Sequence, residues 1–401
     1  MITFGVLKER KNPPDKRVVL TPKACKTIID KYDAKIIVEP SELRTFKEDS
    51  YLTDGLEINS DVSSCDVLFG VKEVPIEALI PNKKYFFFSH TIKEQPYNRG
   101  LLQAILKNKI VLYDHETIVD AKCKRLVAFG RFAGLVGAYN GLRTYGLKHQ
   151  LYELPKAEDL EDLNELMNLL KTLELPPMKI VLTGKGRVGN GAVEILNAVG
   201  IKSVGVDEFL TNDFNHAVYC QIDVKNYNLH KEGKEFNKSD FFEHPENYKG
   251  NFYRFARVSD LFIAGHFYGV GAPYLLTRSD VAKEDFKISV VADISCDIDG
   301  PVATTIRPST IADPIYGLNP KTFEEVDYMN SEAIAVMAVD NLPCELPKDA
   351  SESFSEAFVR YVIPAFYNND ADGVLSRAQM TTSEGTLTDR FSYLQDYVNG
   401  N

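Results

Sequence analysis

The 401-residue sequence lacks the features of membrane-spanning, disulfide-linked and zinc-binding proteins. It has no run of about 18 apolar residues, which a transmembrane helix needs, and its first residues show no basic segment leading into an apolar one. Its six cysteines lie far apart and form no Cys-x-x-Cys pair, which argues against a structural zinc site and a disulfide framework. We therefore expect no signal peptide, no membrane association, no bound metal, and reduced thiols in a cytoplasmic protein.

The sequence also lacks an excess of basic residues. Its formal net charge is −11, from 46 Lys and Arg against 57 Asp and Glu. A broad nucleic-acid-binding surface needs basic residues to displace counterions from phosphate, so we expect no nucleic-acid partner. A local basic pocket for an acidic small molecule remains compatible with this charge. No low-complexity tract or internal repeat is present, and the length predicts a globular protein of two or three domains.

Strand-like and helix-like segments alternate along the first 115 residues. The strand candidates are short apolar runs, and amphipathic segments separate them. The predicted strands are Ile2–Leu7, Lys35–Glu39, Asp66–Val71, Tyr85–Ser89 and Ile110–Tyr113, and the predicted helices include Pro22–Tyr32 and Gly100–Lys107. This alternation predicts parallel βαβ units and an α/β domain.

A second α/β pattern follows a stretch rich in glycine and alanine. This stretch, Val127–Leu147, predicts a long helix whose small residues allow close packing. The later expected elements are an acidic helix at about Ala157–Leu173, a strand at Lys179–Thr183, a helix at Gly191–Val199, strands at Lys202–Val206, Leu261–Gly265 and Ser289–Ile294, a turn at Asn341–Pro347 and a helix at Ser351–Phe366. Residues 210–257 are polar and aromatic and predict no definite fold.

The turn after Lys179–Thr183 has the spacing of a dinucleotide-binding loop, Gly184-x-Gly186-x-x-Gly189. Gly184 would permit a tight turn, Gly186 would let the backbone approach a pyrophosphate, and Gly189 would let helix and strand pack closely. The phosphates would lie at the N-terminus of the following helix, beside Arg187 and Val188. The alternative is an α/β turn that binds no ligand.

The acidic residue that would bind the ribose is Asp207, which we expect at the end of the strand Lys202–Val206. Its carboxylate would accept hydrogen bonds from the ribose hydroxyls and repel a 2′-phosphate, which favours NAD. Lys185, Arg187 and Lys202 are near in sequence and could bind a 2′-phosphate, so NADP remains possible.

These patterns predict an α/β protein with two Rossmann-like domains whose parallel sheets are separated by a cleft. A substrate domain would contain residues 1–130 and about 342–401. A dinucleotide-binding Rossmann domain would contain residues 131–341.

Candidate catalytic side chains follow two strands of the first domain. Lys72 and Glu73 come after one strand and His90 after another, and the carboxyl ends of parallel strands border the ligand crevice of α/β folds. A partly desolvated lysine or a histidine can exchange protons near neutral pH. Arg17 and Arg125 could each hold a carboxylate. The alternatives are a solvated lysine, a structural histidine and surface arginines.

Several stretches resemble the alanine dehydrogenase and transhydrogenase superfamily. Within it, they are similar to the lysine-forming saccharopine dehydrogenases and to the lysine–2-oxoglutarate reductase domain of aminoadipic semialdehyde synthases. The stretches are Gly70–Lys72, Phe87–Lys93, Arg125–Gly130, Ala292–Asp297, Val339–Pro343 and Thr382–Leu387. The resemblance covers nearly the whole chain and implies interconversion of saccharopine with L-lysine and 2-oxoglutarate.

The resemblance also implies roles for single residues. Lys72 and His90 would be the acid–base groups, Asp293 would lie near the nicotinamide, and the substrate would contact Arg17, Glu73, Glu116 and Arg125.

Two features of the sequence depart from the family pattern. Lys124 stands where lysine-forming enzymes tend to carry a second arginine, so carboxylate recognition could differ. The segment Asn212–Arg257 is longer than in the compact family members and lies closer to the reductase-domain type. That type usually prefers NADP, in conflict with Asp207. Two other functions stay open, namely another amino-acid dehydrogenase, such as alanine dehydrogenase, and a non-catalytic NAD(H)-binding module. The sequence predicts neither the oligomeric state nor the direction of the reaction.

Overall fold

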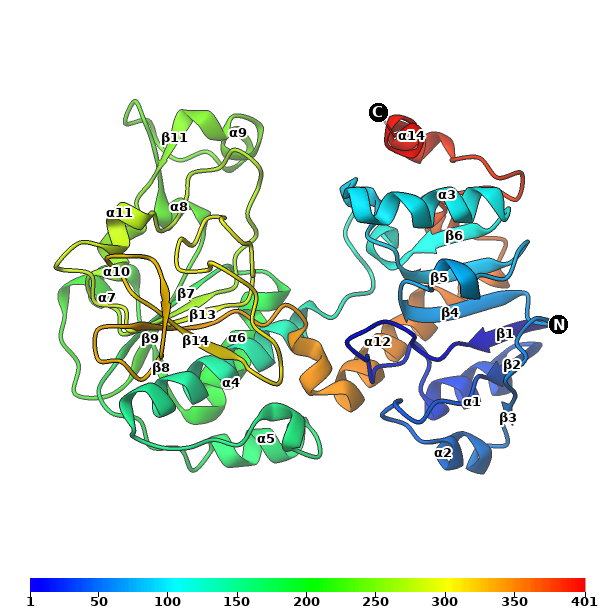
Figure 1. Cartoon of the computed structure of the whole chain (residues 1–401), viewed down its shortest axis with the longest axis horizontal. Coiled ribbons are helices and arrows are strands. Elements are labelled where there is room, and N and C mark those ends of the chain that lie inside the picture. Colours follow the sequence, from blue (N-terminus) through cyan, green and yellow to red (C-terminus); the bar gives the residue numbers. More distant parts are fainter. Residues whose placement is uncertain (401) are drawn as a thin grey trace. The chain divides into compact units, whose positions relative to one another are not determined.

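The computed structural model describes residues 1–400, which form two compact units, each with its own β-sheet (Figure 1). Unit 1 comprises Met1–Phe129 and the described part of Pro347–Asn401, and unit 2 comprises Gly130–Leu346. Both sheets are largely parallel, so the α/β class predicted from the sequence is confirmed.

The sheet of unit 1 has six parallel strands in the order β3-β2-β1-β4-β5-β6. The strands are β1 (Ile2–Val6), β2 (Ala34–Val38), β3 (Glu57–Ile58), β4 (Val67–Lys72), β5 (Lys84–Phe88) and β6 (Val111–Asp114). The five strands predicted in this region are confirmed to within one residue at either end. The two-residue strand β3 was not predicted because it has no apolar run.

Helices cover both faces of this sheet. Successive side chains of a strand point to opposite faces, so its apolar strands place hydrophobic side chains on both faces. Phe69 and Phe86 contact Phe358 of α12 on one face, with ring centroids 5.1 and 5.6 Å apart. Tyr85 and Phe87 belong to the core on the other face, which includes residues of α3 and α14. The helices of unit 1 are α1 (Pro22–Lys31), α2 (Glu48–Thr53), α3 (Arg99–Lys107), α12 (Pro347–Tyr361), α13 (Val374–Ala378) and α14 (Gln395–Asn399).

Helix α12 differs from the predicted Ser351–Phe366 helix at both ends. It begins earlier, at Pro347, because proline is well tolerated in the first turn of a helix. It ends at Tyr361 and a 3₁₀ helix, η8 (Ile363–Phe366), follows it. Pro364 explains this end, since proline lacks the N–H that an α-helix interior requires.

The sheet of unit 2 has the order β15-β14-β16-β13-β12-β7-β9-β8. The pairs from β16 to β8 are parallel, whereas β14 pairs antiparallel with both β15 and β16. The strands are β7 (Lys179–Thr183), β8 (Lys202–Ser203), β9 (Val218–Ile222), β12 (Leu261–Ala264), β13 (Val290–Asp293), β14 (Ile315–Leu318), β15 (Glu325–Val326) and β16 (Ile334–Met337).

The long glycine-rich helix is present as α4 (Gly130–His149). A Cβ atom on Gly134 would lie 1.9 Å from the carbonyl oxygen of Val188 on α6 (Arg187–Val199), and one on Gly141 would lie 2.9 Å from Cβ of Ala292 on β13. Small residues therefore allow α4 to approach both α6 and the sheet, as the sequence predicted.

Two predicted elements of unit 2 are wrong. The acidic segment at Ala157–Leu173 is not one helix, because Asp162 caps a new helix by accepting hydrogen bonds from two backbone amides. It contains a 3₁₀ turn, η5 (Ala157–Asp159), and then α5 (Leu163–Leu170). The strand expected at Lys202–Val206 stops at Ser203, and α7 (Val206–Thr211) begins immediately after Gly205.

Residues 210–257 contribute strand β9 to the unit 2 sheet, and the rest of this range forms short elements on one face of that sheet. Phe252 and Phe255 from this segment join Val181 and Phe262 of the sheet in one core. The elements are α8 (Val224–Tyr227), α9 (Lys238–Glu243), α10 (Tyr253–Ala256) and the antiparallel pair β10 (Asn228–His230) and β11 (Tyr248–Gly250), and α11 (Arg278–Val281) follows later. The expected turn near Asn341 is a 3₁₀ helix, η7 (Leu342–Glu345).

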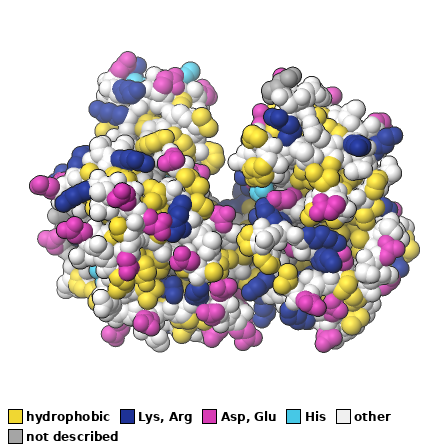
Figure 2. Space-filling model, in the orientation of Figure 1, with side chains coloured by type: hydrophobic (Ala, Val, Ile, Leu, Met, Phe, Trp, Pro, Cys, Tyr) yellow, Lys and Arg dark blue, Asp and Glu magenta, His cyan; other side chains and the backbone are white. Residues whose placement is uncertain are grey.

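The surface shows no dominant charge on the face seen in Figure 2, where acidic and basic side chains are interspersed over the described residues of each unit. Within residues 1–400, no helix is long and apolar enough to cross a membrane. The same residues contain no group of three His, Cys, Asp or Glu side chains placed to hold a metal ion.

Candidate active site

The carboxyl ends of β4 and β5 bring the two predicted acid–base residues to one edge of the unit 1 sheet. Lys72 is paired in register with Phe88, and His90 follows Phe88 by two residues. The His90 ring stacks on the Phe88 ring with centroids 6.2 Å apart. His90 has a left-handed backbone conformation, with φ of 55°, which turns the chain sharply at the strand end.

Glu116 lies beside His90 among positive charges. It sits on the 3₁₀ turn η4 (His115–Thr117), which directly follows β6. Its carboxylate oxygens lie 3.6 Å from Arg125 Nη2, 3.9 Å from Lys93 Nζ and 3.8 Å from His90 Nδ1. Burial alone would raise the pKa of Glu116, but contact with His90 and the charges of Lys93 and Arg125 lower it to about 2. Glu116 is therefore an anion at neutral pH, positioned to hold His90 and Arg125.

Arg17 is held by an internal carboxylate. Its Nε and Nη2 donate to the two oxygens of Asp15 at 3.0 and 2.6 Å, and its guanidinium lies 4.2 Å from the centroid of the Phe129 ring. Burial would raise the pKa of Asp15, but the charge and hydrogen bonds of Arg17 outweigh it and lower that pKa to about 2. The charge of Lys72 adds to this effect, which places the Asp15–Arg17 pair within electrostatic reach of Lys72.

Glu9 is a further buried carboxylate at this edge, and sequence reasoning missed it. Its two oxygens accept hydrogen bonds from the amides of Val71, at 2.7 Å, and Lys72, at 2.8 Å. The pairing of β4 with β5 shifts register between Phe69 and Lys72, so Glu9 binds amides where the strand pairing is irregular. Burial and the nearby charge of Asp15 raise the pKa of Glu9 to about 7. The two amide hydrogen bonds and the charge of Arg17 lower this pKa, but their effect is smaller.

The last predicted residue of this cluster, Glu73, forms an ion pair with Lys11. Its Oε1 lies 2.5 Å from Lys11 Nζ. Lys11 comes from the segment after β1, two residues beyond Glu9. The structure therefore gathers Arg17, Lys72, Glu73, His90, Glu116 and Arg125 at the carboxyl ends of β1, β4, β5 and β6. A position just after a strand end was the available signal for Glu9, as it was for Lys72.

The glycine turn of unit 2 has the geometry of a phosphate-binding loop. Gly184 has φ of +94°, and a Cβ there would lie 2.3 Å from the Gly265 carbonyl oxygen. A Cβ on Gly189 would lie 2.0 Å from the Gly184 carbonyl oxygen, whereas one on Gly186 would meet nothing within 4 Å. Helix α6 begins at Arg187 with no side-chain hydrogen bond from its N-cap, Gly186. The loop thus leaves open space at a 13-residue helix N-terminus, which suits a pyrophosphate.

Asp207 does not occupy the expected position at a strand end. It is an exposed residue in the first turn of α7, and β9 lies between β8 and β7 in the sheet. The strand that flanks the glycine turn is therefore β9, and the amide of Gly184 donates to the Ile222 carbonyl at its end, at 2.9 Å. The acidic residue at the end of β9 is Asp223. The insertion of β8 and α7 before β9 explains why Asp223 was missed.

Two further polar residues lie at the carboxyl ends of neighbouring strands. Asp293, at the end of β13, is fully buried and accepts hydrogen bonds from Thr305 Oγ1 at 2.5 Å and Ser295 Oγ at 2.6 Å. Burial raises its pKa. His266 follows β12, and its Nδ1 lies 2.9 Å from Thr183 Oγ1. Burial lowers the pKa of His266 to about 4, so it is neutral at physiological pH.

The order of strands defines the class of protein. In the sheet, β9 and then β8 lie on one side of β7 and β12 lies on the other, so the glycine turn after β7 lies at the switch point where open α/β sheets bind nucleotides. The model of the "Alanine dehydrogenase/PNT, N-terminal domain" matches residues 5–136, and the model of the "Alanine dehydrogenase/PNT, C-terminal domain" matches residues 161–389. The chain belongs to the alanine dehydrogenase/PNT family, whose C-terminal domain binds NAD(P).

Within this family the chain is similar to saccharopine dehydrogenases. It is 25% identical to "Saccharopine dehydrogenase [NAD(+), L-lysine-forming]" of Yarrowia lipolytica, over 88% of this chain and 89% of that protein. It is 29% identical to "Alpha-aminoadipic semialdehyde synthase" of Arabidopsis thaliana, over 97% of this chain and 41% of that protein. The chain thus spans less than half the length of the semialdehyde synthases that it matches.

A solved structure supports the fold alone. That of an L-alanine dehydrogenase superposes with a TM-score of 0.68 at 16% identity, covering 99% of this chain and all of the other.

Proposed function

We propose that this chain is an NAD(P)-dependent oxidoreductase that interconverts saccharopine with L-lysine and 2-oxoglutarate. The observation that carries the proposal is the cluster of Lys72, His90, Glu116 and Arg125 at one sheet edge. The chain around this cluster is similar over most of its length to lysine-forming saccharopine dehydrogenases. We also retain the prediction of a cytoplasmic location for this chain.

Lys72 and His90 would share the proton transfers. The lysine ε-amine attacks the 2-oxoglutarate ketone only when it is neutral, so one group removes a proton from it. The carbinolamine that forms loses water, so one group donates a proton to the departing hydroxyl. Each acid–base group typically contributes about 10²–10⁴-fold to the rate. A reduced nicotinamide, when bound, supplies the hydride that reduces the resulting imine carbon.

The arginines would hold the substrate carboxylates. A guanidinium can bind a carboxylate through two parallel hydrogen bonds. Arg17 is oriented for this role by Asp15, and Arg125 lies beside Glu116. Glu73 and Glu116 would then contact the cationic parts of the substrate or keep the neighbouring cations in place.

The dinucleotide would be held by unit 2. Gly184, Gly186 and Gly189 would shape the pyrophosphate site at the N-terminus of α6, where Arg187 and Val188 begin the helix. Asp223, rather than Asp207, would accept hydrogen bonds from the ribose hydroxyls, because it ends the strand beside the glycine turn. A carboxylate at this position favours NAD over NADP. Asp293 would act near the nicotinamide by fixing the loop that follows β13, where Ser295 and Thr305 bind its carboxylate.

A substrate screen tests the proposal. We expect oxidation of NADH or NADPH to require L-lysine and 2-oxoglutarate together, and pyruvate with ammonia to give little turnover. The Lys72→Met variant should keep its affinity for the dinucleotide and lose at least about 100-fold in kcat. The Lys84→Met variant is the control, because Lys84 is exposed at the opposite end of β5. Full turnover by Lys72→Met would exclude the role given to Lys72.

A further inference from the structure

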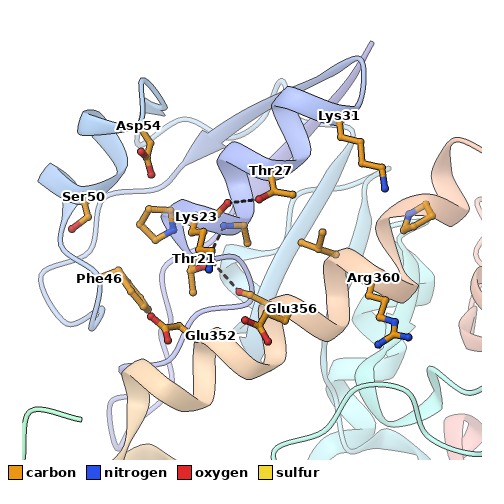
Figure 3. A pocket seen from close by; sticks show the side chains of 15 residues that line it. Thr21, Lys23, Thr27, Lys31, Phe46, Ser50, Asp54, Glu352, Glu356 and Arg360 are labelled. Atoms are coloured by element: carbon orange, nitrogen blue, oxygen red, sulfur yellow. Dashed lines mark hydrogen bonds between the residues drawn. The ribbon is translucent and has the colours of Figure 1, made fainter. Parts of the chain in front are cut away.

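Unit 1 contains a pocket of about 630 Å³ that involves none of the residues of the catalytic cluster. It lies between α1, α12 and the segment that contains α2, and Figure 3 shows the side chains that line it. Its volume is within the range of small-molecule sites, about 300–1,000 Å³. Its apolar lining includes Ala24, Phe46 and Val359.

Charged side chains of opposite sign lie toward different ends of this pocket. Figure 3 shows Asp54 and Glu352 toward one end and Lys31 and Arg360 toward the other. On α12, Arg360 follows Glu352 by eight positions, which corresponds to about 12 Å of helix at about 1.5 Å per residue. Lys23 contributes a positive charge near Glu352, and Glu356 adds a further negative one between the ends.

These charges are not neutralised by salt bridges within the protein. Among residues 1–400, none of Asp54, Glu352, Lys31 and Arg360 forms an ion pair. Partial burial and the nearby charges of Asp349 and Glu356 raise the pKa of Glu352, against the opposing charges of Lys348 and Lys23. A ligand with separated positive and negative groups would satisfy both ends of the pocket.

One wall of the pocket also holds the segment that carries Arg17. Ser355 Oγ, on α12, accepts a hydrogen bond from the Thr21 amide at 2.9 Å and donates one to the Val19 carbonyl at 2.6 Å. One turn earlier, Ser351 Oγ accepts from the Val18 amide at 3.0 Å. Thr21 and Ser355 line the pocket, and Figure 3 labels Thr21 among the lining side chains. A ligand that shifts α12 relative to α1 therefore acts on the backbone next to Arg17.

We propose that this pocket is a regulatory site for a basic amino acid. The α-carboxylate binds toward Lys31 and Arg360, and the cationic end of the side chain binds toward Asp54 and Glu352. Occupancy changes the rate of the reaction by moving the segment Arg17–Thr21. The binding site stands on the pocket alone, and its effect on rate rests on the proposed function.

L-Arginine is the probe for binding, because its guanidinium stays protonated and cannot condense with a ketone as the lysine amine does. Calorimetric titration should show one saturable site in the wild type and in Lys72→Met. Thr27→Trp, which fills the pocket from α1, and Arg360→Gln should each weaken binding by at least tenfold. Ile29→Trp is the matched control, because Ile29 lies on α1 outside the pocket lining, and this variant should bind L-arginine as the wild type does.

Rate measurements then separate the two claims. L-Arginine should change the rate of NADH or NADPH oxidation in the wild type and leave the rate of Thr27→Trp unchanged. Binding without any oxidoreductase turnover would keep the site and contradict the proposed function instead. The proposal would be overturned if L-arginine showed no saturable binding, or if Thr27→Trp bound it as well as the wild type does. It would also be overturned if L-arginine inhibited competitively with lysine and this inhibition persisted in Thr27→Trp.

Discussion

Replacing Asp223 by asparagine should weaken NADH binding without weakening the fold. Asp223 Oδ1 caps α8 by accepting the Val224 amide at 2.8 Å, and the Asp223 amide donates to Asn226 Oδ1 at 2.9 Å. Asparagine is an equally good N-cap, so the melting temperature should change little. The variant loses only the negative charge that would receive the ribose hydroxyls.

The size of the effect follows from the strength of hydrogen bonds to charged groups. Such bonds contribute about 1.5–3 kcal/mol, which corresponds to about a 10- to 150-fold rise in the Kd for NADH. NADPH should bind Asp223→Asn more tightly than it binds the wild type, because the variant no longer repels a 2′-phosphate. Fluorescence titration with each cofactor measures both changes.

Asp207→Asn is the matched control for this prediction. Asp207 is exposed in the first turn of α7, and β9 separates β8 from the glycine turn. Its replacement should change neither Kd by more than about twofold. If Asp207→Asn weakened NADH binding and Asp223→Asn did not, the topological argument for Asp223 would be refuted.

Four further substitutions test the two sites. Gly186→Ala should fold normally and bind NADH at least about tenfold more weakly. Gly189→Ala should instead lower the melting temperature of the protein, because its Cβ would lie 2.0 Å from a carbonyl oxygen. Equal melting temperatures of the two variants would contradict this. Asp15→Asn should lower the free energy of unfolding by about 3 kcal/mol at pH 7, because it removes the carboxylate that pairs with buried Arg17; chemical denaturation measures it against exposed Asp30→Asn. Glu9→Gln should abolish a pH-dependent loss of stability of about 3 kcal/mol between pH 4.5 and 7, and a wild type and variant with parallel pH profiles would refute it.

The signs of the two pH effects differ. The pKa of Asp15 is lowered, from 3.8 to about 2, so its stabilisation is complete above pH 4 and is lost as pH falls toward 2. The free energy of unfolding falls by about 2.4 kcal/mol over this range, at about 1.36 kcal/mol for each unit by which the pKa of Asp15 is shifted. The pKa of Glu9 is raised, from 4.5 to about 7, so its folded form prefers the proton and stability falls as pH rises through this range.

Most strands could be predicted because each is a short apolar run between turn residues. β1, β4, β7 and β12 all have this pattern, and the glycine turn after β7 has a specific spacing. Strand Lys202–Val206 was predicted wrongly because two apolar valines suggested a strand, whereas Gly205 instead precedes a helix. The α7 residue Phe209 is buried in the core of unit 2.

The candidate site could be predicted only in part. Lys72 ends a strand and His90 follows one, and both were found for that reason. Glu9 is 63 residues from the Lys72 amide that it binds, and its burial is a property of the folded sheet. Asp223 requires the strand order, since only the sheet shows that β9 rather than β8 flanks β7. The sequence carries no direct record of such long-range contacts.

Product analysis with labelled substrates tests the proposed reaction most directly. The enzyme is given L-lysine labelled with ¹⁵N at the ε-amine, 2-oxoglutarate and NADH or NADPH deuterated at the transferable position of the nicotinamide. We expect one product, saccharopine, that retains the ¹⁵N and gains one deuterium, and we expect Lys72→Met to form it at least about 100-fold more slowly. An amino-acid product that takes its nitrogen from free ammonia, or cofactor oxidation without incorporation of lysine nitrogen, would contradict the account.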